Sequence, residues 1–418
     1  MDLKPRNQPK VAALIEKGAI IPNPLTVDIG DEVTLEHISD KDVTIYPGCR
    51  IYGKDTVICG GVRLGAEAPV TIENCLLGPR VELKGGYFRQ SVFLAGSNVG
   101  SGAQVREACL LEEEVSAAHC VGLKQTILFP FVVLGSLINF CDCLMAGGTN
   151  RKNHSEVGSS YIHFNFTPDG DKATASLFGD VPRGAMLNQP PIFLGGQGGA
   201  VGPLRLGFGN VVAAGSILRG DFPEDNQLIV AGPRRDTVVD YTPLLYPHLR
   251  RLIENNVYYL ANLLALEQWY VHVRNRFLAA QEFGDLLCQG ALKVLKQAKD
   301  ERTKRLKIVA ENMPRSMKAD DQPDPLKQEL HRHADTLLAS FSRESTEQYG
   351  AESRNRFLAR LFADGAVPAE EYIKTIQSLP AEVAQLGTQW LETFIDAVCR
   401  NAANALPSFG LFDDDQDE

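Results

Sequence analysis

Aliphatic residues recur at every sixth position between Leu194 and Leu218, and this spacing restricts the fold more than any other feature of the sequence. The period is marked by Leu194, Ala200, Leu206, Val212 and Leu218, with Gly, Ala, Asn and Ser between them. A helix repeats every 3.6 residues and a strand every two, so neither explains a period of six. Short repeats of fixed length are typical of a solenoid, in which stacked units complete one another's core.

Runs with the same spacing occur through much of the N-terminal half. They are Ile45, Ile51 and Val57; Val99 and Val105; and Val115, Val121, Ile127 and Val133. Three faces of six residues close a coil of about 18 residues, with the aliphatic side chains stacked inside a prism. We therefore predict a left-handed parallel β-helix, an exception to the right-handed crossover rule. A β-sandwich is the alternative, but its strands would alternate with a period of two.

The pattern changes from Tyr241 onward: Pro243 and Pro247 end the repeats, and helical spacing of apolar residues follows from Leu249. A second helical pattern covers residues 283–312, and a stretch rich in charge and proline follows it. The expected organisation is an N-terminal segment 1–40, a β-helix 41–240, a helical region 241–312, a linker 313–325, a second helical region 326–405 and an acidic disordered tail 406–418. We expect a mainly β protein followed by an α-helical C-terminal domain.

Composition indicates a cytoplasmic globular protein with small-molecule partners. Of 418 residues, 44% are apolar and 22% are charged, and neither a secretory signal nor a membrane-spanning run of about 18 apolar residues is present. The net charge of −10 disfavours nucleic acid as a partner. The nine cysteines are expected to be reduced core residues. Cys141 and Cys143 lack the spacing of a zinc motif, so no metal site is predicted.

Several stretches resemble the hexapeptide-repeat acyltransferases, in particular the acetyltransferase half of the bifunctional bacterial enzymes that make UDP-N-acetylglucosamine from glucosamine-1-phosphate. VGLKQTIL resembles the stretch that carries a sugar-phosphate lysine, YIHFNFTPDGDKAT resembles an asparagine loop, and LGFGNVVAAGSI resembles a coenzyme-A coil. The first 120 residues lack the Gly-rich nucleotide loop of the uridylyltransferase half. The resemblance therefore implies acyl transfer without nucleotidyl transfer.

By this resemblance the protein is an acetyl-CoA-dependent acyltransferase for a phosphorylated or nucleotide-linked amino sugar of the glucosamine-1-phosphate type. Lys124 and Lys172 are then expected to bind the substrate, and Asn165 is expected to be catalytic. Coenzyme binding is assigned to Gly196, Ala213, Ala214, Arg234 and Arg235. The two arginines are expected to approach the coenzyme's phosphates.

The family's histidine base is missing, because Ser136 in LGSLINFCDC occupies its position. A serine hydroxyl is too weak a base at neutral pH to accept the proton of the attacking amine. The additional segment AGGTNRKNHSEVGSSY contains His154, and the adjacent Arg151 and Lys152 suit an anionic phosphate. We therefore expect His154 to be the base, with His163 as the reserve candidate.

Structural roles are the alternative for each of these residues. The His154 segment can be a solvated loop, His163 a core histidine, Lys124 a partner in an ion pair between coils, and Asn165 part of an internal ladder. The glycines of LGGQGG allow close approach by a ligand or another subunit. A further alternative brings His119, His154 and His163 together on zinc across a trimer interface.

Two classes of function follow. In the first, the protein is a homotrimeric acyltransferase with its sites between adjacent prisms. In the second, it is a noncatalytic trimeric scaffold or a sugar-nucleotide-binding protein whose helical domain recruits a protein partner. Binding of coenzyme A distinguishes the two classes.

Overall fold

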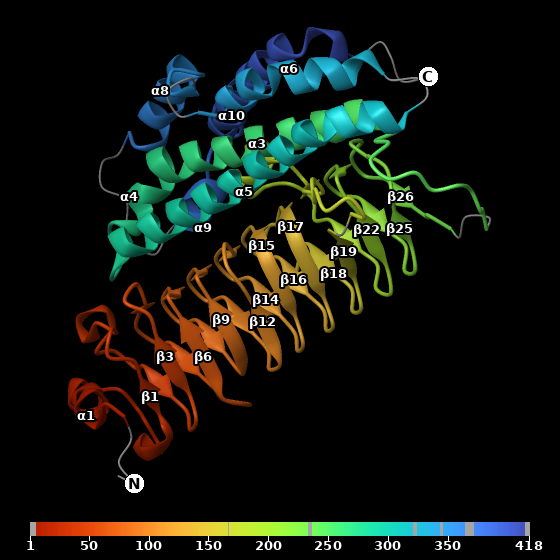
Figure 1. The fold of residues 1–418 in the computed structure, drawn as a ribbon. Coiled ribbons are helices and arrows are strands. Elements are labelled where there is room, and N and C mark those ends of the chain that lie inside the picture. The colour runs from red at the N-terminus through yellow and green to blue at the C-terminus, as the bar shows by residue number, and fades with distance from the viewer. Residues whose placement is uncertain are drawn as a thin grey trace.

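A solenoid of parallel strands runs from β1 (Asp28–Ile29) to β26 (Leu228–Ile229) and is followed by a layer of helices (Figure 1). The computed structural model describes residues 6–165, 167–232, 236–320, 324–342, 346–363 and 372–413. The predicted fold class is confirmed, but the solenoid begins at residue 28 rather than 41 and ends at 229 rather than 240. The expected N-terminal segment therefore includes α1 (Gln8–Lys17) and part of the first coil.

Each coil contributes short strands to three faces, which we name A, B and C in chain order. Face A is a ten-stranded sheet of β2 (Thr44–Ile45), β5 (Arg63–Leu64), β8 (Glu82–Leu83), β11 (Asn98–Val99), β14 (Ser116–Ala117), β16 (Val133–Leu134), β18 (Glu156–Val157), β21 (Phe193–Leu194), β24 (Val211–Val212) and β26. Face B contains β1, β3 (Arg50–Tyr52), β6 (Val70–Glu73), β9 (Gly86–Arg89), β12 (Ala103–Val105), β19 (Ile162–Phe164), β22 (Gly199–Val201) and β25 (Ile217–Leu218). Face C contains β4 (Val57–Ile58), β7 (Leu76–Leu77), β10 (Val92–Phe93), β13 (Leu110–Leu111), β20 (Ser176–Phe178) and β23 (Arg205–Leu206). The longer strands β15 (Gly122–Leu128) and β17 (Asn139–Met145) pass from face B to face C and join them into one sheet.

The period of six is confirmed in the stretch from Leu194 to Leu218. Its aliphatic residues occupy faces A, B, C, A and B in turn, and each is at most 3% exposed. The side chains pack inside the prism, where strands from adjacent coils bring similar residues into register. This stacking is the core of the solenoid.

The predicted register is wrong in two other runs. On each face, side chains that point into the prism form an inward column, and those that point away form an outward column. On face C, the inward column that contains Leu206 includes Ile58 rather than Val57. It likewise includes Leu128 rather than Ile127. Coils differ in length, and the corners between faces absorb the additional residues. A strict count of six residues therefore selects some residues whose side chains point out of the prism.

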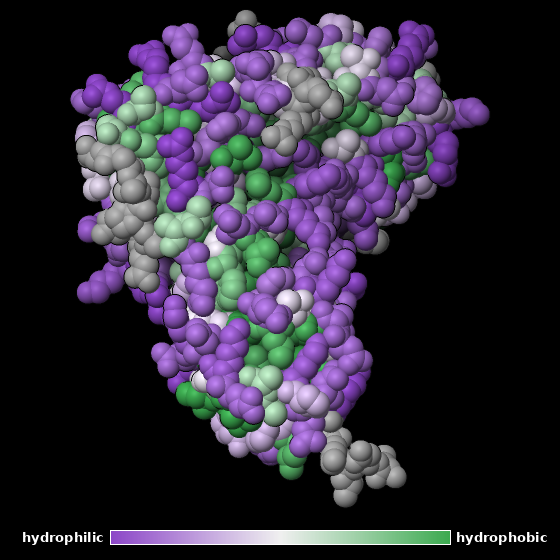
Figure 2. Space-filling view, turned by 90° about the vertical axis from the view of Figure 1, so that its left-hand side faces the viewer, coloured by the Kyte–Doolittle hydropathy of each residue, from purple (hydrophilic) through white to green (hydrophobic). Residues whose placement is uncertain are grey.

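Helices of the described C-terminal part of the chain cover face C in two tiers, and we call these helices together the helical layer (Figure 1). They are α3 (Leu249–Trp269), a π-helical turn (Tyr270–Arg274), α4 (Asn275–Leu278), α5 (Gly284–Ala319), α6 (Pro325–Ala339), α8 (Ala351–Leu361), α9 (Tyr372–Gln377) and α10 (Ala381–Ala405). Helix α5 contacts β7 and β10, and α3 contacts β20. Figure 2 shows the N-terminal coils projecting below these helices. On the surface of the coils that faces the viewer, hydrophobic side chains lie in the middle and hydrophilic side chains lie along both margins.

Face C needs this cover because its outward column is also hydrophobic. The column contains Val57, Leu76, Val92, Leu110, Ile127, Leu144 and Leu177. Helix α5 lies against it so closely that a Cβ atom on Gly290 would meet Leu76 Cδ2 at 2.5 Å. The glycine therefore permits the contact between helix and sheet.

The boundaries expected for the helical part are corrected in three places. Helix α5 continues to Ala319, so residues 313–319 of the expected linker are helical. The two expected helical regions are not separate, because α5 packs on α6 and α3 on α10. Phe409 and Leu411 are buried, which excludes residues 409 and 411 from a disordered tail. Residues 414–418 lie outside the described part of the chain.

Eight of the nine cysteines are buried free thiols, as expected, whereas Cys120 is exposed at a corner of the prism. Its backbone is left-handed, with φ 58°. Within the described residues, no helix is both long and apolar enough to cross a membrane.

A buried ionic cluster joins the helical layer to the corner between faces C and A. Arg274 of the π-helical turn donates a hydrogen bond to Glu113, and its guanidinium carbon lies 3.7 Å from the centre of the Tyr372 ring. Tyr270 donates to the neighbouring Glu112. Burial raises the pKa of Glu112 to about 7, because the ionised carboxylate would lose its hydration beside Glu113.

This cluster predicts that the helical layer is held more weakly at neutral pH than at mildly acidic pH. The pKa of Glu112 is raised on folding, so its stabilising contribution is complete below the unfolded pKa near 4.5 and is lost as the pH rises through about 7. Melting curves between pH 5 and pH 8 should show a steeper fall of Tm for the wild type than for Glu112→Gln. Glu114→Gln, whose carboxylate pairs with Arg151 nearer the surface, is the matched control and should retain the wild-type slope. Equal slopes for all three proteins would contradict this assignment.

Candidate functional site

The corner between faces A and B carries a ladder of small residues that includes one imidazole. Because Ala117 pairs with Leu134, His119 stands one coil before Ser136 in this ladder. His119 Nδ1 lies 3.0 Å from Ser136 Oγ, and the contact is exposed. The histidine that the sequence lacks at position 136 is therefore present at the equivalent position of the preceding coil.

A groove of about 580 Å³ lies on face B beside this corner. Its lining includes Gln104, Arg106, Cys120, Gly122, Asn139 and Cys141. Gly122 leaves the groove open, since the nearest atoms to a Cβ built there would be 3.8 Å away. Apolar residues also line the groove, including the exposed Leu137, so it offers both polar and apolar contacts to a small ligand.

Three cationic side chains gather at the other edge of face B, near its corner with face C. Burial raises the pKa of the Cys141 thiol to about 11, and the positive charges of Arg106, Lys124 and Lys172 act in the opposite direction. Lys124 pairs with Glu107 of the preceding coil at 2.9 Å, which is the structural alternative that the sequence left open. Among the described residues, Arg106 and Lys172 have no ion-pair partner.

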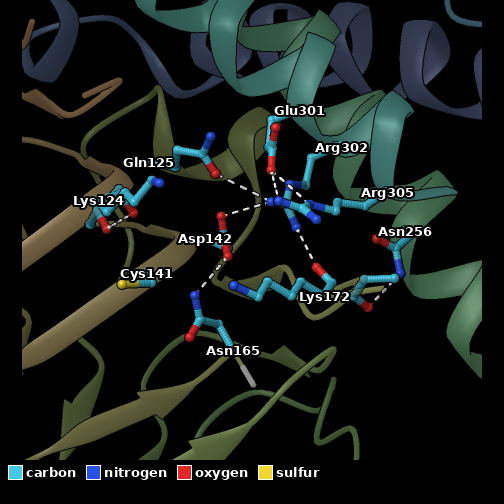
Figure 3. Close-up of polar contacts among 12 residues, drawn as sticks. Lys124, Gln125, Cys141, Asp142, Asn165, Lys172, Asn256, Glu301, Arg302 and Arg305 are labelled. Carbon is cyan, nitrogen blue, oxygen red and sulfur yellow. Dashed lines mark hydrogen bonds and ion pairs between the residues drawn. The ribbon is translucent and has the colours of Figure 1, made fainter. Parts of the chain in front are cut away.

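Asn165 and Lys172 are brought to this edge by Asp142 and by helix α5 (Figure 3). Asn165 Nδ2 donates to Asp142 Oδ2 at 3.3 Å, which links equivalent positions of two adjacent coils at the corner between faces B and C. Arg302 of α5 donates to Asp142 Oδ1 at 2.7 Å and to the carbonyl oxygen of Lys172 at 3.1 Å. Two of the predicted residues, Asn165 and Lys172, therefore lie near the Asp142 carboxylate, whereas Lys124 of the neighbouring strand pairs with Glu107.

His163 points into the prism, where it has a structural role. It is 2% exposed and lies in the same inward column as Ala200. Its Nδ1 donates to the Cys141 carbonyl at 2.6 Å, and its Nε2 accepts from Ser176 Oγ at 2.7 Å. With both nitrogens occupied and burial lowering its pKa to about 4, the imidazole has no access to a ligand on the surface.

His154 lies at the corner between faces C and A, away from Lys124 in the same chain. Its Nδ1 lies 2.8 Å from the Arg151 carbonyl, and its Nε2 lies 3.2 Å from Glu156. Arg151 pairs with Glu114 of that corner, and Lys152 is exposed beside it. Within one chain, the structure does not bring this segment to the residues around Asp142.

The residues assigned to the coenzyme fall on the corner that carries His119. Gly196 and Ala214 continue the ladder after Ser159, and Ala213 precedes Ala214. Close stacking of coils explains the glycine, because a Cβ on Gly196 would meet the Ser159 carbonyl oxygen at 2.7 Å. Arg234 and Arg235 lie outside the described residues.

Zinc coordination by His119, His154 and His163 is excluded within the chain, because His163 is enclosed in the prism. The described residues contain no group of three or more His, Cys, Asp or Glu side chains that could hold a metal ion.

The motifs did not direct attention to three residues that the structure places in this region, which are His119, Arg106 and Arg302. His119 could have been found by counting back 17 residues from Ser136, but only if the coil length at that point were known. Arg106 lies in none of the sequence motifs that we identified. Arg302 lies 160 residues from Asp142 in the chain, and no sequence pattern connects the two.

The fold is a parallel β-helix with a six-residue repeat, and its similarity to curated proteins is confined to about half of the chain. No family model matches the chain. Over the β-helix the chain is similar to the bifunctional protein GlmU of Carboxydothermus hydrogenoformans, with 29% identity over 232 residues, 56% of this chain and 46% of the relative. The GlmU proteins of Janthinobacterium sp. and Thermotoga maritima are 26% and 24% identical over 54% and 51% of this chain, and over 44% and 42% of their own lengths.

The chain thus spans less than half the length of these curated relatives. Before the solenoid, the described residues form α1 and short turns, with no uridylyltransferase-like region evident in them. Among solved structures, UDP-N-acetylglucosamine acyltransferase from Campylobacter jejuni aligns with 49% of this chain and 67% of that chain at 13% identity. The TM-score of 0.14 is too low to support an argument.

The geometry of His163 predicts an effect on stability rather than on chemistry. His163→Leu removes the donor to the Cys141 carbonyl and should lower the free energy of unfolding by about 1–3 kcal/mol. Because folding lowers the pKa of His163 to about 4, the wild type should lose stability as the pH falls from 6.5 towards 4, and the variant should lose less. Denaturant unfolding at several pH values measures both effects. A stable variant with the wild-type pH profile would contradict the core role.

Proposed function

We propose that the protein is an acyltransferase that transfers an acyl group, acetyl in the simplest case, from coenzyme A to the amine of an amino sugar that carries a phosphate. The observation that carries this proposal is the contact of His119 with Ser136 at the corner beside a groove whose lining includes the cation Arg106. The relationship of the β-helix to GlmU proteins supports the reaction class.

The acceptor's phosphate would lie near Arg106 and Lys172, whose side chains have no ion-pair partner among the described residues. Charge-assisted hydrogen bonds to such cations are short and strong, so they can anchor a phosphate. Lys124 would join them by exchanging Glu107 for the ligand. The sugar would then cross Gly122 towards the corner that carries His119.

His119 is the proposed general base. When its proton is on Nδ1, this nitrogen donates to Ser136 Oγ and Nε2 is free to accept the proton of the attacking amine. The amine nitrogen forms a bond to the thioester carbonyl carbon, and the carbon–sulfur bond breaks as coenzyme A leaves with its thiol restored. Ser136 thus orients the base of the preceding coil instead of acting as a base itself.

The coenzyme's extended arm is proposed to follow the corner ladder from Ala214 past Gly196 to Ser159. Side chains at these positions are small, so the backbone is accessible to a narrow chain. This path would deliver the thioester to His119 and leave the groove on face B for the acceptor.

Replacing the base tests the proposal directly. His119→Asn should lower the turnover of glucosamine-1-phosphate and acetyl-CoA by about 100-fold to 10,000-fold, the usual loss for a general base. Coenzyme affinity, measured by calorimetry, should stay near the wild-type value. Ser136→Ala should give a smaller loss, because the imidazole remains.

His154→Asn is the informative comparison, since the sequence alone assigned the base to His154. Full activity in this variant together with loss in His119→Asn would support the groove on face B. The reverse result would move the site to the corner between faces C and A. Absence of coenzyme binding and of transfer in the wild type would favour the scaffold function.

We also propose that the protein is a homotrimer. Hydrophobic side chains are exposed on the outward sides of faces A and B in the C-terminal coils, including Phe193 at 39%, Val211 at 42%, Leu228 at 71% and Ile162 at 40%. A second copy of the chain is a suitable cover for such a surface. Mass measurement in solution should give three times the monomer mass, and a monomer at all concentrations would contradict it.

A further inference from the structure

The loop that carries Lys172 is held by the helical layer. We call residues 167–173 the acceptor loop. Its contacts with the helices and with the segment before them are Asn256 Nδ2 to the Ala173 carbonyl at 3.0 Å, Arg302 Nη1 to the Lys172 carbonyl at 3.1 Å, Tyr246 Oη to Asp171 Oδ2 at 3.0 Å, and the Leu244 amide to Asp169 Oδ2 at 3.0 Å. Asn312 of α5 in turn donates to Tyr246 Oη at 3.0 Å.

Arg302 is the buried centre of these contacts. It is 2% exposed, and its guanidinium reaches three coils of the solenoid (Figure 3). Nη2 donates to Asp142 Oδ1 at 2.7 Å and to Gln125 Oε1 at 3.2 Å, while Nη1 donates to the Lys172 carbonyl. The planar fork of donors makes these simultaneous contacts possible, which the single ammonium of a lysine would not reproduce.

The charge of Arg302 also determines whether the Lys172 ammonium has to pair with Asp142. Asp142 is 4% exposed, and a buried carboxylate requires a cation beside it. Figure 3 shows the Lys172 side chain extending towards Asp142 and Asn165. Without Arg302, the nearest free cation for Asp142 would be Lys172. The guanidinium therefore leaves the Lys172 ammonium available to an anionic ligand.

We propose that Arg302 is a positioning residue for the acceptor site, and that the helical layer is thereby part of this site. Arg302 satisfies Asp142, fixes the backbone at Lys172, and keeps the Lys172 ammonium free for the acceptor's phosphate. Asp142 transmits the same constraint to Asn165 through the hydrogen bond between their side chains. This inference rests on the proposed function, because it concerns the same acceptor.

Substitution of both partners separates a charge effect from a loss of structure. Arg302→Met should raise the KM for glucosamine-1-phosphate by about tenfold or more, while the affinity for coenzyme A stays at the wild-type value. Adding Asp142→Asn removes the uncompensated carboxylate and should restore most of the acceptor affinity. Arg302→Lys keeps the charge but not the fork, so it should fall between the wild type and Arg302→Met. Arg305→Met, which breaks only an ion pair with Glu301 on the same helix, is the matched control.

Amide hydrogen exchange tests the positioning role without any ligand. Exchange in residues 167–173 should be faster in Arg302→Met than in the wild type and Arg305→Met, with the strands of face A unchanged. If Arg302→Met does not fold, the double variant and Arg302→Lys provide the same comparison. Wild-type exchange in the loop, or no recovery of acceptor affinity in the double variant, would overturn the proposal. A wild type that neither binds the sugar phosphate nor transfers acetyl groups would instead overturn the proposed function, while the exchange result would still decide whether Arg302 positions the loop.

Discussion

The helical layer depends on one constraint, which is that face C carries hydrophobic side chains on both sides of its strands. The inward column fills the prism, so the outward column from Val57 to Leu177 requires a second cover. Burial of each such side chain contributes about 1.5–3 kcal/mol. An exposed ion pair such as Lys293 with Asp55, at 2.8 Å between helix and solenoid, contributes at most about 1 kcal/mol. Hydrophobic cover, and not surface charge, therefore holds the helices on face C.

Covering face C leaves faces A and B for ligands and other subunits. The groove lies on face B, between the ladder of small residues with His119 and the corner at which α5 reaches the solenoid. Arg302 enters at that corner because α5 runs along face C beside it, and its charge is matched by Asp142. The same packing that completes the core thus supports the loop with Lys172. A separate role in recruiting partners is not required to explain the helices.

The six-residue period predicted the fold because each inward position has one requirement, an aliphatic side chain that stacks on its neighbours. The period predicted the wrong orientation for Val57 and Ile127. Corners of different length precede them, so their side chains point out of the prism. The motifs proposed Lys124, Asn165 and Lys172 as site residues; the structure places Asn165 and Lys172 near Asp142 and pairs Lys124 with Glu107. They could not identify His119, because its equivalence to Ser136 depends on a coil of 17 residues. The contribution of α5 was beyond sequence reasoning, since Arg302 and Asp142 meet only in the folded chain.

The central claim is that face B, and not the corner that carries His154, holds the acceptor. A crystal structure of the protein with glucosamine-1-phosphate and coenzyme A measures this most directly. The account predicts the phosphate beside Arg106 and Lys172, the sugar over Gly122, and the amine within hydrogen-bond distance of His119 Nε2. A sugar phosphate bound instead beside Arg151 and His154, with the groove on face B empty, would contradict it.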